Sequence, residues 1–133
     1  MSPSHKNSIV LVDTSVFIDY FRATTAKSEP LTSLLEESRV ILSPFVRMEL
    51  QMGVRARERK QLGSLLEALP LAQFDMNHFR VAESLVPLVR SSGLSVGLVD
   101  YLIAMQALDL QVPLFTLDNV MKKLAGVLEI EIF

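Results

Sequence analysis

Short, continuous hydrophobic runs alternate along this chain with longer stretches in which hydrophobic side chains recur every three or four positions. The short runs are typical of strands buried in a parallel sheet, and the longer stretches are typical of amphipathic helices. The pattern predicts strands at residues 9–12, 40–42, 71–74, 114–117 and 128–132. It predicts helices at residues 14–22, from 30 onwards, 44–53, 55–69, from 75 or 77 to 91, 98–110 and 119–124.

Strands that alternate with helices indicate an α/β sandwich around a mostly parallel central sheet of four to five strands. Residues 98–110 are almost all hydrophobic, so this helix is expected to be buried on most sides. Pro87 predicts a kink or break in the helix that ends near residue 91, and Gly93 is expected to stop it. The whole chain, residues 1–133, is predicted to be a single domain with residues 1–8 as a flexible N-terminal segment.

Acidic residues stand at the ends of two predicted strands and inside one helix. Asp13 and Asp118 each follow a strand directly and precede a helix, which places both at the carboxyl edge of the sheet, where open parallel sheets bind ligands. Their side chains converge if the first and fourth strands are neighbours. Glu49 shares a helical stripe with Phe45 and Met52, so it is expected to point inward.

A fourth acid, Asp100, lies in the first turn of the hydrophobic helix. It shares a stripe with Ile103, Ala104 and Ala107, and the two alanines would allow a close approach to the sheet. The positive end of the helix dipole favours ionisation of a carboxyl group at this position. Ser95 is a candidate cap for the same helix.

Four carboxylates in hydrophobic surroundings are costly unless cations balance them, and no equally placed Lys or Arg accompanies these four. Each acid alone has a simpler explanation as a helix cap or a surface ion pair. Together, however, they favour one site that binds a divalent cation. Ligands that are all oxygen select Mg²⁺ or Mn²⁺ over zinc or copper, and such a centre suits the hydrolysis of phosphodiesters.

Two hydroxyl residues stand close to these acids in the sequence. Ser15 lies two positions after Asp13, and Thr116 lies two positions before Asp118. Each hydroxyl could orient its neighbouring carboxylate or bind a water molecule. Plain capping of a helix is the alternative for each of them.

The composition predicts a partner chain, and the sequence contains a local strip of basic residues. Half of the residues are hydrophobic and the mean hydropathy is +0.35, which predicts a homodimer or another partner chain. A net charge of −2 argues against broad electrostatic capture of nucleic acid. Five of the thirteen basic residues nevertheless cluster after residue 46, and this strip could hold a phosphate backbone or be a solvated helix face: Arg47, Arg55, Arg57, Arg59 and Lys60.

The chain contains no cysteine, which excludes disulfides, thiolate zinc sites and cysteine nucleophiles. Its polar start does not resemble a signal peptide, and no hydrophobic stretch approaches the ~20 residues of a membrane helix. These features predict a cytoplasmic protein without a membrane partner.

Four motifs resemble the PIN-domain family, in particular the small bacterial VapC-type toxins. They are residues 12–21 (VDTSVFIDYF), Met48-Glu49-Leu50, the run from Gly93 to Asp100 with Ile103-Ala104 behind it, and Thr116-Leu117-Asp118-Asn119. Their order and spacing carry the resemblance over essentially the whole chain. The resemblance implies a PIN-like three-layer α/β/α sandwich and the toxin of a toxin–antitoxin pair.

The same resemblance implies an endoribonuclease that depends on Mg²⁺ or Mn²⁺. Asp13 and Asp100 would be the main metal ligands, and Glu49 and Asp118 would complete the pocket. Expected partners are the RNA substrate, a second copy of the chain and a VapB-type antitoxin. The departures from the family pattern, Ser95 and Val120-Met121 in place of a common Thr and a common aromatic residue, remove no ligand.

The alternative is a catalytically silent PIN-like interaction module that binds RNA or a partner protein. Two other enzyme or signalling classes fit less well. Phosphatases of the haloacid dehalogenase type need a second Asp two residues after the first, where this chain has Ser15. A signalling receiver domain needs a Lys after its last strand, and here that strand runs into the terminus.

Overall fold

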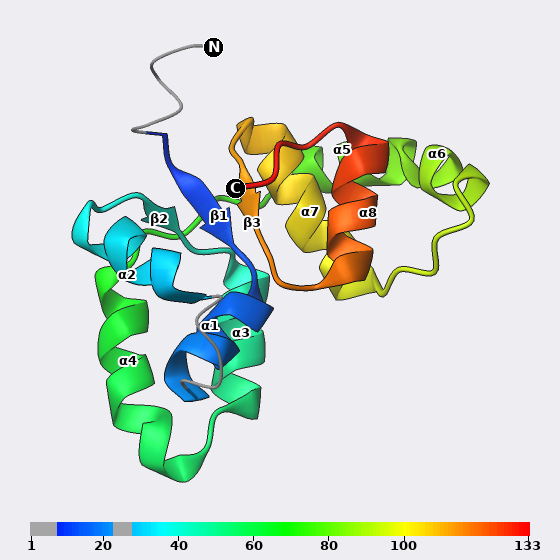
Figure 1. Ribbon diagram of the computed structural model, residues 1–133. Helices are drawn as coiled ribbons and strands as arrows, with labels where there is room; N and C mark the ends of the chain where they lie inside the picture. Colours follow the sequence, from blue (N-terminus) through cyan, green and yellow to red (C-terminus); the bar gives the residue numbers. More distant parts are fainter. Residues whose placement is uncertain (1–7, 23–27) are drawn as a thin grey trace.

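Three short parallel strands form the centre of the computed structural model, which describes residues 8–22 and 28–133 (Figure 1). They are β1 (Val10–Val12), β2 (Val40–Ile41) and β3 (Leu114–Phe115), in the order β2-β1-β3. A single parallel bridge extends the sheet at each edge, from Leu42 to Leu71 and from Leu114 to Ile132. The parallel sheet confirms the predicted α/β class.

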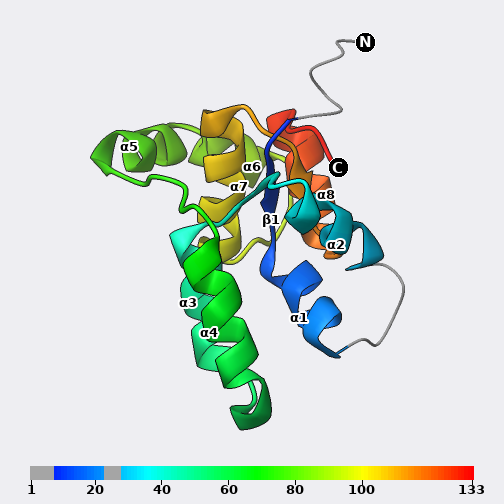
Figure 2. The ribbon, with the colours of Figure 1, turned by 90° about the vertical axis from the view of Figure 1, so that its left-hand side faces the viewer.

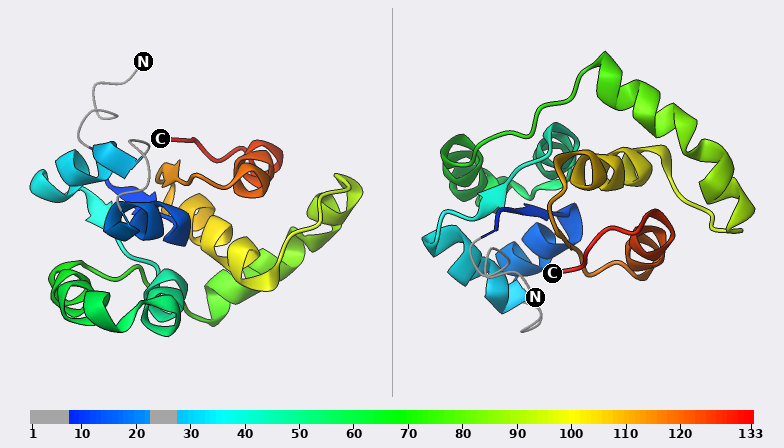
Figure 3. Two further views of the ribbon diagram at one scale, coloured as in Figure 1. Left: turned by 60° about the horizontal axis from the view of Figure 1, so that its bottom comes forward. Right: turned by 90° about the horizontal axis from the view of Figure 1, so that it is seen from above.

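Helices cover both faces of this sheet (Figure 3). One layer contains α1, α2 and α8, and the other contains α3, α4 and α7. Outside these layers, α5 packs against α7, and α6 contacts α8. The arrangement is the predicted three-layer sandwich. The helices are α1 (Thr14–Arg22), α2 (Glu29–Glu36), α3 (Pro44–Gly53), the 3₁₀ turn η3 (Ala56–Glu58), α4 (Arg59–Ala68), α5 (Met76–Ser84), α6 (Val86–Ser91), α7 (Leu98–Leu110) and α8 (Asn119–Leu128).

The hydrophobic core lies around β1 and α7. All three residues of β1 are fully buried, and the middle of α7 from Tyr101 to Ala107 is buried too, as its sequence predicted. One polar side chain in this stretch, Gln106, is satisfied because it accepts a hydrogen bond from the Ser43 hydroxyl and donates one to the Gln73 carbonyl at 3.3 Å. The long hydrophobic helix is therefore tied to the start of α3 by polar contacts as well as by packing.

Two of the predicted strands do not form as strands in the structure. Residues 71–74 and 128–132 each contribute one bridge instead of a strand. The helix α8 also continues to Leu128, four residues beyond its predicted end, because Leu128 is buried on the same side as Met121, Leu124 and Ala125. Tertiary packing, which the local pattern does not contain, extends this helix.

The predicted break near Pro87 is confirmed. The helix divides at Leu85 into α5 and α6, and Pro87 stands in the first turn of α6, where its missing N–H leaves no helical hydrogen bond unmade. The Asp75 carboxylate caps α5 by accepting from Asn77 N at 2.9 Å. Gly93, with a φ of 79°, follows α6 as expected.

The α3–α4 pair forms a hairpin that projects from the sheet beside α1 (Figure 2). Residues 55–58, predicted as part of one helix, instead contain η3 at the tip of this hairpin. Of the segment 1–8 predicted to be flexible, residues 1–7 lie outside the described residues, and the Ser8 carbonyl accepts from Arg39 Nε at 2.9 Å. Among the residues that the structure describes, no helix is long and hydrophobic enough to cross a membrane.

Candidate active site

The carboxyl ends of β1 and β3 lie side by side because the two strands are neighbours in the sheet. Asp13 follows β1 directly, and its backbone N–H donates to the Phe115 carbonyl of β3 at 2.8 Å. Asp118 follows shortly after β3 and caps α8 by accepting from Met121 N at 3.0 Å. The sheet order thus brings the start of α1 and the start of α8 to one edge.

Two hydroxyl groups fix the carboxylate of Asp13, a residue that is only 4% exposed. Its Oδ2 atom accepts from Thr116 Oγ1 at 2.7 Å and from Ser15 Oγ at 3.0 Å. Ser15 Oγ in turn accepts from Leu117 N at 3.0 Å, and Thr116 Oγ1 accepts from Asp118 N at 3.1 Å. Both hydroxyls therefore orient the acid and also hold the chain between β3 and α8 in place.

Glu49 reaches the same region from α3. Its Oε1 atom accepts from Thr14 Oγ1 at 2.6 Å, a contact between residues 35 apart in the sequence. Sequence reasoning gave Thr14 no role at the site, because nothing local links it to a glutamate on another helix. The stripe that was expected to turn Glu49 inward is only partly confirmed. Phe45 packs against the core and Glu49 is half-buried, but Met52 is 82% exposed and the fully buried positions of α3 are Val46 and Leu50.

Asp100 stands in the first turn of α7, on the stripe predicted for it. Ile103, Ala104 and Ala107 on that stripe are all fully buried. The predicted Ser95 cap is wrong, because the N-cap residue is Gly97 and no side chain caps the helix. The backbone N–H groups of this turn are consequently not occupied by a capping side chain.

The electrostatics show that the four acids share one region. Burial raises the pKa of Asp13 above its ordinary value of 3.8, against the hydrogen bonds that lower it, and repulsion from Glu49 raises it further. Burial also raises the pKa of Asp100, followed by repulsion from Asp13, Glu49 and Asp118. The pKa of Asp100 is therefore raised, although its place in the first turn of the helix was expected to favour ionisation.

No cation balances this charge within residues 8–22 and 28–133. None of the four acids forms a salt bridge with Lys, Arg or His there. Four converging carboxylates without a basic partner are an arrangement that structural ion pairs do not explain.

The chain has clear relatives among known proteins. The model of the PIN domain matches residues 10–127. The chain belongs to the PIN-domain family. It is 32% identical over 107 residues to Ribonuclease VapC19 of Mycobacterium tuberculosis, an alignment that covers 80% of this chain and 86% of that relative.

Solved structures with the same fold include VapBC2 from Rickettsia felis, bound to a DNA fragment from its promoter. That chain superposes with a TM-score of 0.73 at 20% identity, covering 94% of this chain and 97% of the other. VapBC-1 from nontypeable Haemophilus influenzae gives a TM-score of 0.72 at 21% identity, covering 94% and 96%. At this level of identity the likeness shows that the chains share the PIN fold. The four acids described above lie at one edge of the sheet in this fold.

The donor groups of this PIN domain fit a hard divalent cation. All four acids offer carboxylate oxygens, which Mg²⁺ and Mn²⁺ prefer. As far as the described residues go, no three Asp, Glu or His side chains stand close enough together to hold an ion at once. Mg²⁺ retains several waters and needs only one or two carboxylates, so a pair such as Asp13 and Asp100 would be enough.

The basic strip lies away from the acids. Arg55, Arg57 and Arg59 are exposed at the tip of the α3–α4 hairpin, and Arg55 Nε lies 3.8 Å from Glu58 Oε1. Arg47 turns toward α4, where it donates to the Leu66 carbonyl at 3.1 Å. The structure therefore does not bring these arginines to the four acids.

Proposed function

We propose that this protein is a Mg²⁺- or Mn²⁺-dependent endoribonuclease that hydrolyses RNA phosphodiester bonds, and that it acts as the toxin of a VapBC-type pair. One observation carries the proposal: Asp100 is repelled by the negative charges of Asp13, Glu49 and Asp118, and none of the four carboxylates has a basic partner in the described part of the chain. The relationship to Ribonuclease VapC19 supports RNA as the substrate.

The residues would divide the work as follows. Asp13, with one oxygen held by Ser15 and Thr116, and Asp100 are the main ligands of the cation. Glu49, held by Thr14, and Asp118 complete the pocket. A divalent cation there would neutralise charge on the phosphate and make water a better nucleophile at neutral pH.

The repulsion among the acids has a consequence for this arrangement. Hydrogen bonds from Thr116, Thr14 and Met121 N already hold the carboxylates of Asp13, Glu49 and Asp118, so these three acids are positioned before a cation arrives. The free energy that burial and repulsion cost the free protein is recovered when the cation binds. Carboxylates that are held in place before the cation binds would help to position the phosphate.

Two protein partners follow from the same proposal. Solved structures with this fold include several VapBC assemblies, which supports a VapB-type antitoxin as the protein that neutralises this chain in the cytoplasm. A homodimer is supported by the exposed hydrophobic side chains on α5, α6 and the start of α7: Met76, Phe79, Val81, Val86, Leu88 and Leu98.

A cleavage assay tests the proposal. Purified protein should cut RNA with Mg²⁺ or Mn²⁺ present, and EDTA should stop the reaction. Asp13→Ala should be inactive under every condition, because its carboxylate is a main ligand. A protein that binds RNA or an antitoxin but cuts no RNA with either metal would instead be the silent interaction module.

We also propose that Arg55, Arg57 and Arg59 hold the RNA backbone, since all three are exposed around η3 at the tip of the hairpin. Changing them together to Gln should weaken RNA binding and make it less sensitive to salt. The slope of log affinity against log salt should fall by roughly 0.7 for each phosphate that the protein no longer neutralises. Titration of RNA at several salt concentrations measures that slope. An unchanged slope would show that the strip is a solvated surface.

A further inference from the structure

A narrow groove lies between α1 and the α3–α4 hairpin, and the proposed chemistry does not use it. It begins at Glu49, one of the four acids, and follows α1 past Ile18 and Phe21 to Arg22 and Glu58. The groove therefore connects the acidic centre to the basic tip of the hairpin. A ligand in this groove would lie next to any phosphate held by the four acids.

The walls of the groove are hydrophobic and leave its middle open. Leu50 and Leu62 are almost fully buried beneath it, while Phe21 and Ile18 remain partly exposed along α1. Gly53 forms part of the opposite wall, and a Cβ atom added there would meet no other atom within 4 Å. Gly53 and Phe21 both line the groove, and a larger side chain at residue 53 would extend into open space there.

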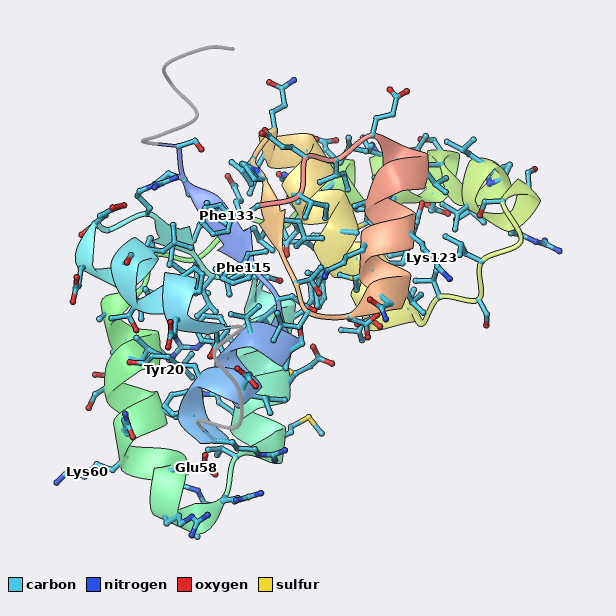
Figure 4. The ribbon with its side chains drawn as sticks, viewed as in Figure 1. Tyr20, Glu58, Lys60, Phe115, Lys123 and Phe133 are labelled. Carbon is cyan, nitrogen blue, oxygen red and sulfur yellow. The ribbon has the colours of Figure 1, made fainter. Side chains whose placement is uncertain are left out.

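Opposite charges stand at the far end of the slot. Arg22 has no hydrogen-bond or ion-pair partner in the described part of the chain. The Glu58 side chain is only 13% exposed, and Arg55 Nε lies 3.8 Å from its Oε1 atom. Figure 4 shows Glu58 below the end of α1, whereas Lys60 points away from the protein. A guanidinium group and a half-used carboxylate are thus both available to a ligand.

We propose that this groove binds an unpaired guanine base of the RNA, adjacent to the phosphate at the acidic centre. The inference rests on the function proposed above. Glu58 would accept from the N1–H and 2-amino groups of guanine, and Arg22 would donate to O6 or N7. Phe21 and Ile18 would contact the face of the ring.

The chemistry selects guanine over other occupants. Guanine presents two adjacent donors, which match a carboxylate, together with the O6 and N7 acceptors, which match a guanidinium group. Adenine and cytosine present one amino group and uracil one ring N–H on the corresponding edge, so each would leave one of these charged groups poorly paired. A second phosphate would be repelled by Glu49 and Glu58 at the two ends.

Binding of short RNAs without cleavage tests the base preference. The probes are fluorescent hexauridine and versions with one central guanosine, inosine or adenosine, titrated onto the full protein in EDTA. The guanosine probe should bind about tenfold more tightly than the inosine or adenosine probe, the lower end of what a bidentate contact gives. Glu58→Gln should remove the advantage of guanosine over inosine, which lacks the 2-amino group. Equal binding of all four probes would overturn the proposal.

A steric variant tests the location. Gly53→Leu should fill the slot and weaken binding of the guanosine probe about tenfold, to the level of hexauridine. Gly63→Leu is the matched control, because Gly63 also has open space around it but lines a different depression on α4. Unchanged binding of the guanosine probe by Gly53→Leu would overturn the proposal. An effect of Gly53→Leu only on the protein's mass in solution or on antitoxin binding would also overturn it, and would assign the groove to a protein partner.

The cleavage assay separates this inference from the proposed function. A guanosine preference that disappears with Gly53→Leu, in a protein that cuts no RNA with metal, would support the groove and contradict the nuclease. Cleavage at the normal rate with no base preference in binding would support the nuclease and contradict the groove.

Discussion

Two groups of acidic residues in this protein behave in opposite ways. In the first, the His78 ring lies between Asp75 Oδ1 at 2.7 Å and Asp109 Oδ2 at 2.6 Å, and stacks on Phe74. Hydrogen bonds from the His78 backbone and ring lower the pKa of Asp75. In the second, burial and mutual repulsion raise the pKa of Asp13 and Asp100.

The difference separates acids that hold the fold together from acids that are available for chemistry. The His78 group joins the start of α5 to the end of α7, and both of its carboxylates lie against a ring nitrogen. Asp13 and Glu49 accept from hydroxyl groups and Asp118 accepts from a backbone amide, but none of the acids at the sheet edge has a basic partner in the described part of the chain. Perturbed carboxyl groups without a basic partner mark a functional site more often than a structural one.

The largest expected effect separates the two groups by catalysis. Asp100→Ala should lower the rate of RNA cleavage by about a thousandfold, the scale of losing a main electrostatic group at an active site. The variant should remain folded, because it removes one of several crowded negative charges. Asp109→Ala, in the His78 group, is the control and should cut RNA at the normal rate. An unfolded Asp100→Ala protein, or normal cleavage by it, would contradict the assignment.

Divalent cations should stabilise the protein through the sheet-edge acids alone. Mg²⁺ or Mn²⁺ at about 100 times its dissociation constant adds about 2.7 kcal/mol to the free energy of unfolding, which raises the melting temperature by several degrees. Asp13→Asn should lose most of this increase, while Asp75→Asn should keep it. Thermal melting with and without the metal measures both, and an equal increase in all three proteins would place the cation elsewhere.

Loss of the Asp75 carboxylate should affect stability and leave cleavage unchanged. Asp75 accepts from Asn77 N at 2.9 Å and from His78 N at 3.2 Å, so Asp75→Ala removes the cap of α5. The melting temperature should fall by a few degrees. A fall in the cleavage rate at a temperature where the variant is fully folded would show that the His78 group also serves the active site.

The pH dependence of stability should have opposite signs in the two groups. Asp100 has a raised pKa in the folded state, so between its ordinary value of 3.8 and that raised pKa the folded protein binds more protons than the unfolded chain. Stability from this group is therefore present at low pH and lost as the pH rises. Asp75 has a lowered pKa, so its contribution is present above 3.8 and is lost as the pH falls.

Denaturant unfolding without metal measures how the stability contributed by Asp100 changes with pH. Asp100→Asn and the wild type should be equally stable at a pH below the ordinary pKa of Asp, and the variant should become more stable as the pH rises. The gain is limited to about 1 kcal/mol because this carboxyl group is partly exposed to solvent. A variant that is less stable than the wild type at neutral pH would show that the Asp100 charge is already balanced in the free protein.

Much of the fold could be predicted because it follows from local signals. The positions of β1, α3 and α7 follow from hydrophobic periodicity, and the break before Pro87 follows from its missing N–H. The predictions were wrong where a segment depends on distant neighbours. Residues 71–74 and 128–132 lie at the edges of the sheet and make one bridge each, so their hydrophobic runs do not extend the ladder.

The candidate site divides in the same way. The acids could be chosen from the sequence, because a carboxylate that ends a buried strand or shares a stripe with buried residues is visible in the pattern. The contacts that hold them could not. Thr14 reaches Glu49 across 35 residues and Thr116 reaches Asp13 across 103, and no local pattern records which helices and strands become neighbours.

The sequence by itself determined that helices and strands alternate, that four acids stand at or near their ends, and that no cysteine chemistry takes part. Only the tertiary structure decided that β1 lies beside β3, that hydroxyl groups orient Asp13 and Glu49, and that a groove leads from Glu49 to Glu58. The physical reason is the distance along the chain over which each interaction acts. Periodicity and capping act within a few residues, whereas strand order and side-chain partners depend on the simultaneous burial of the whole core.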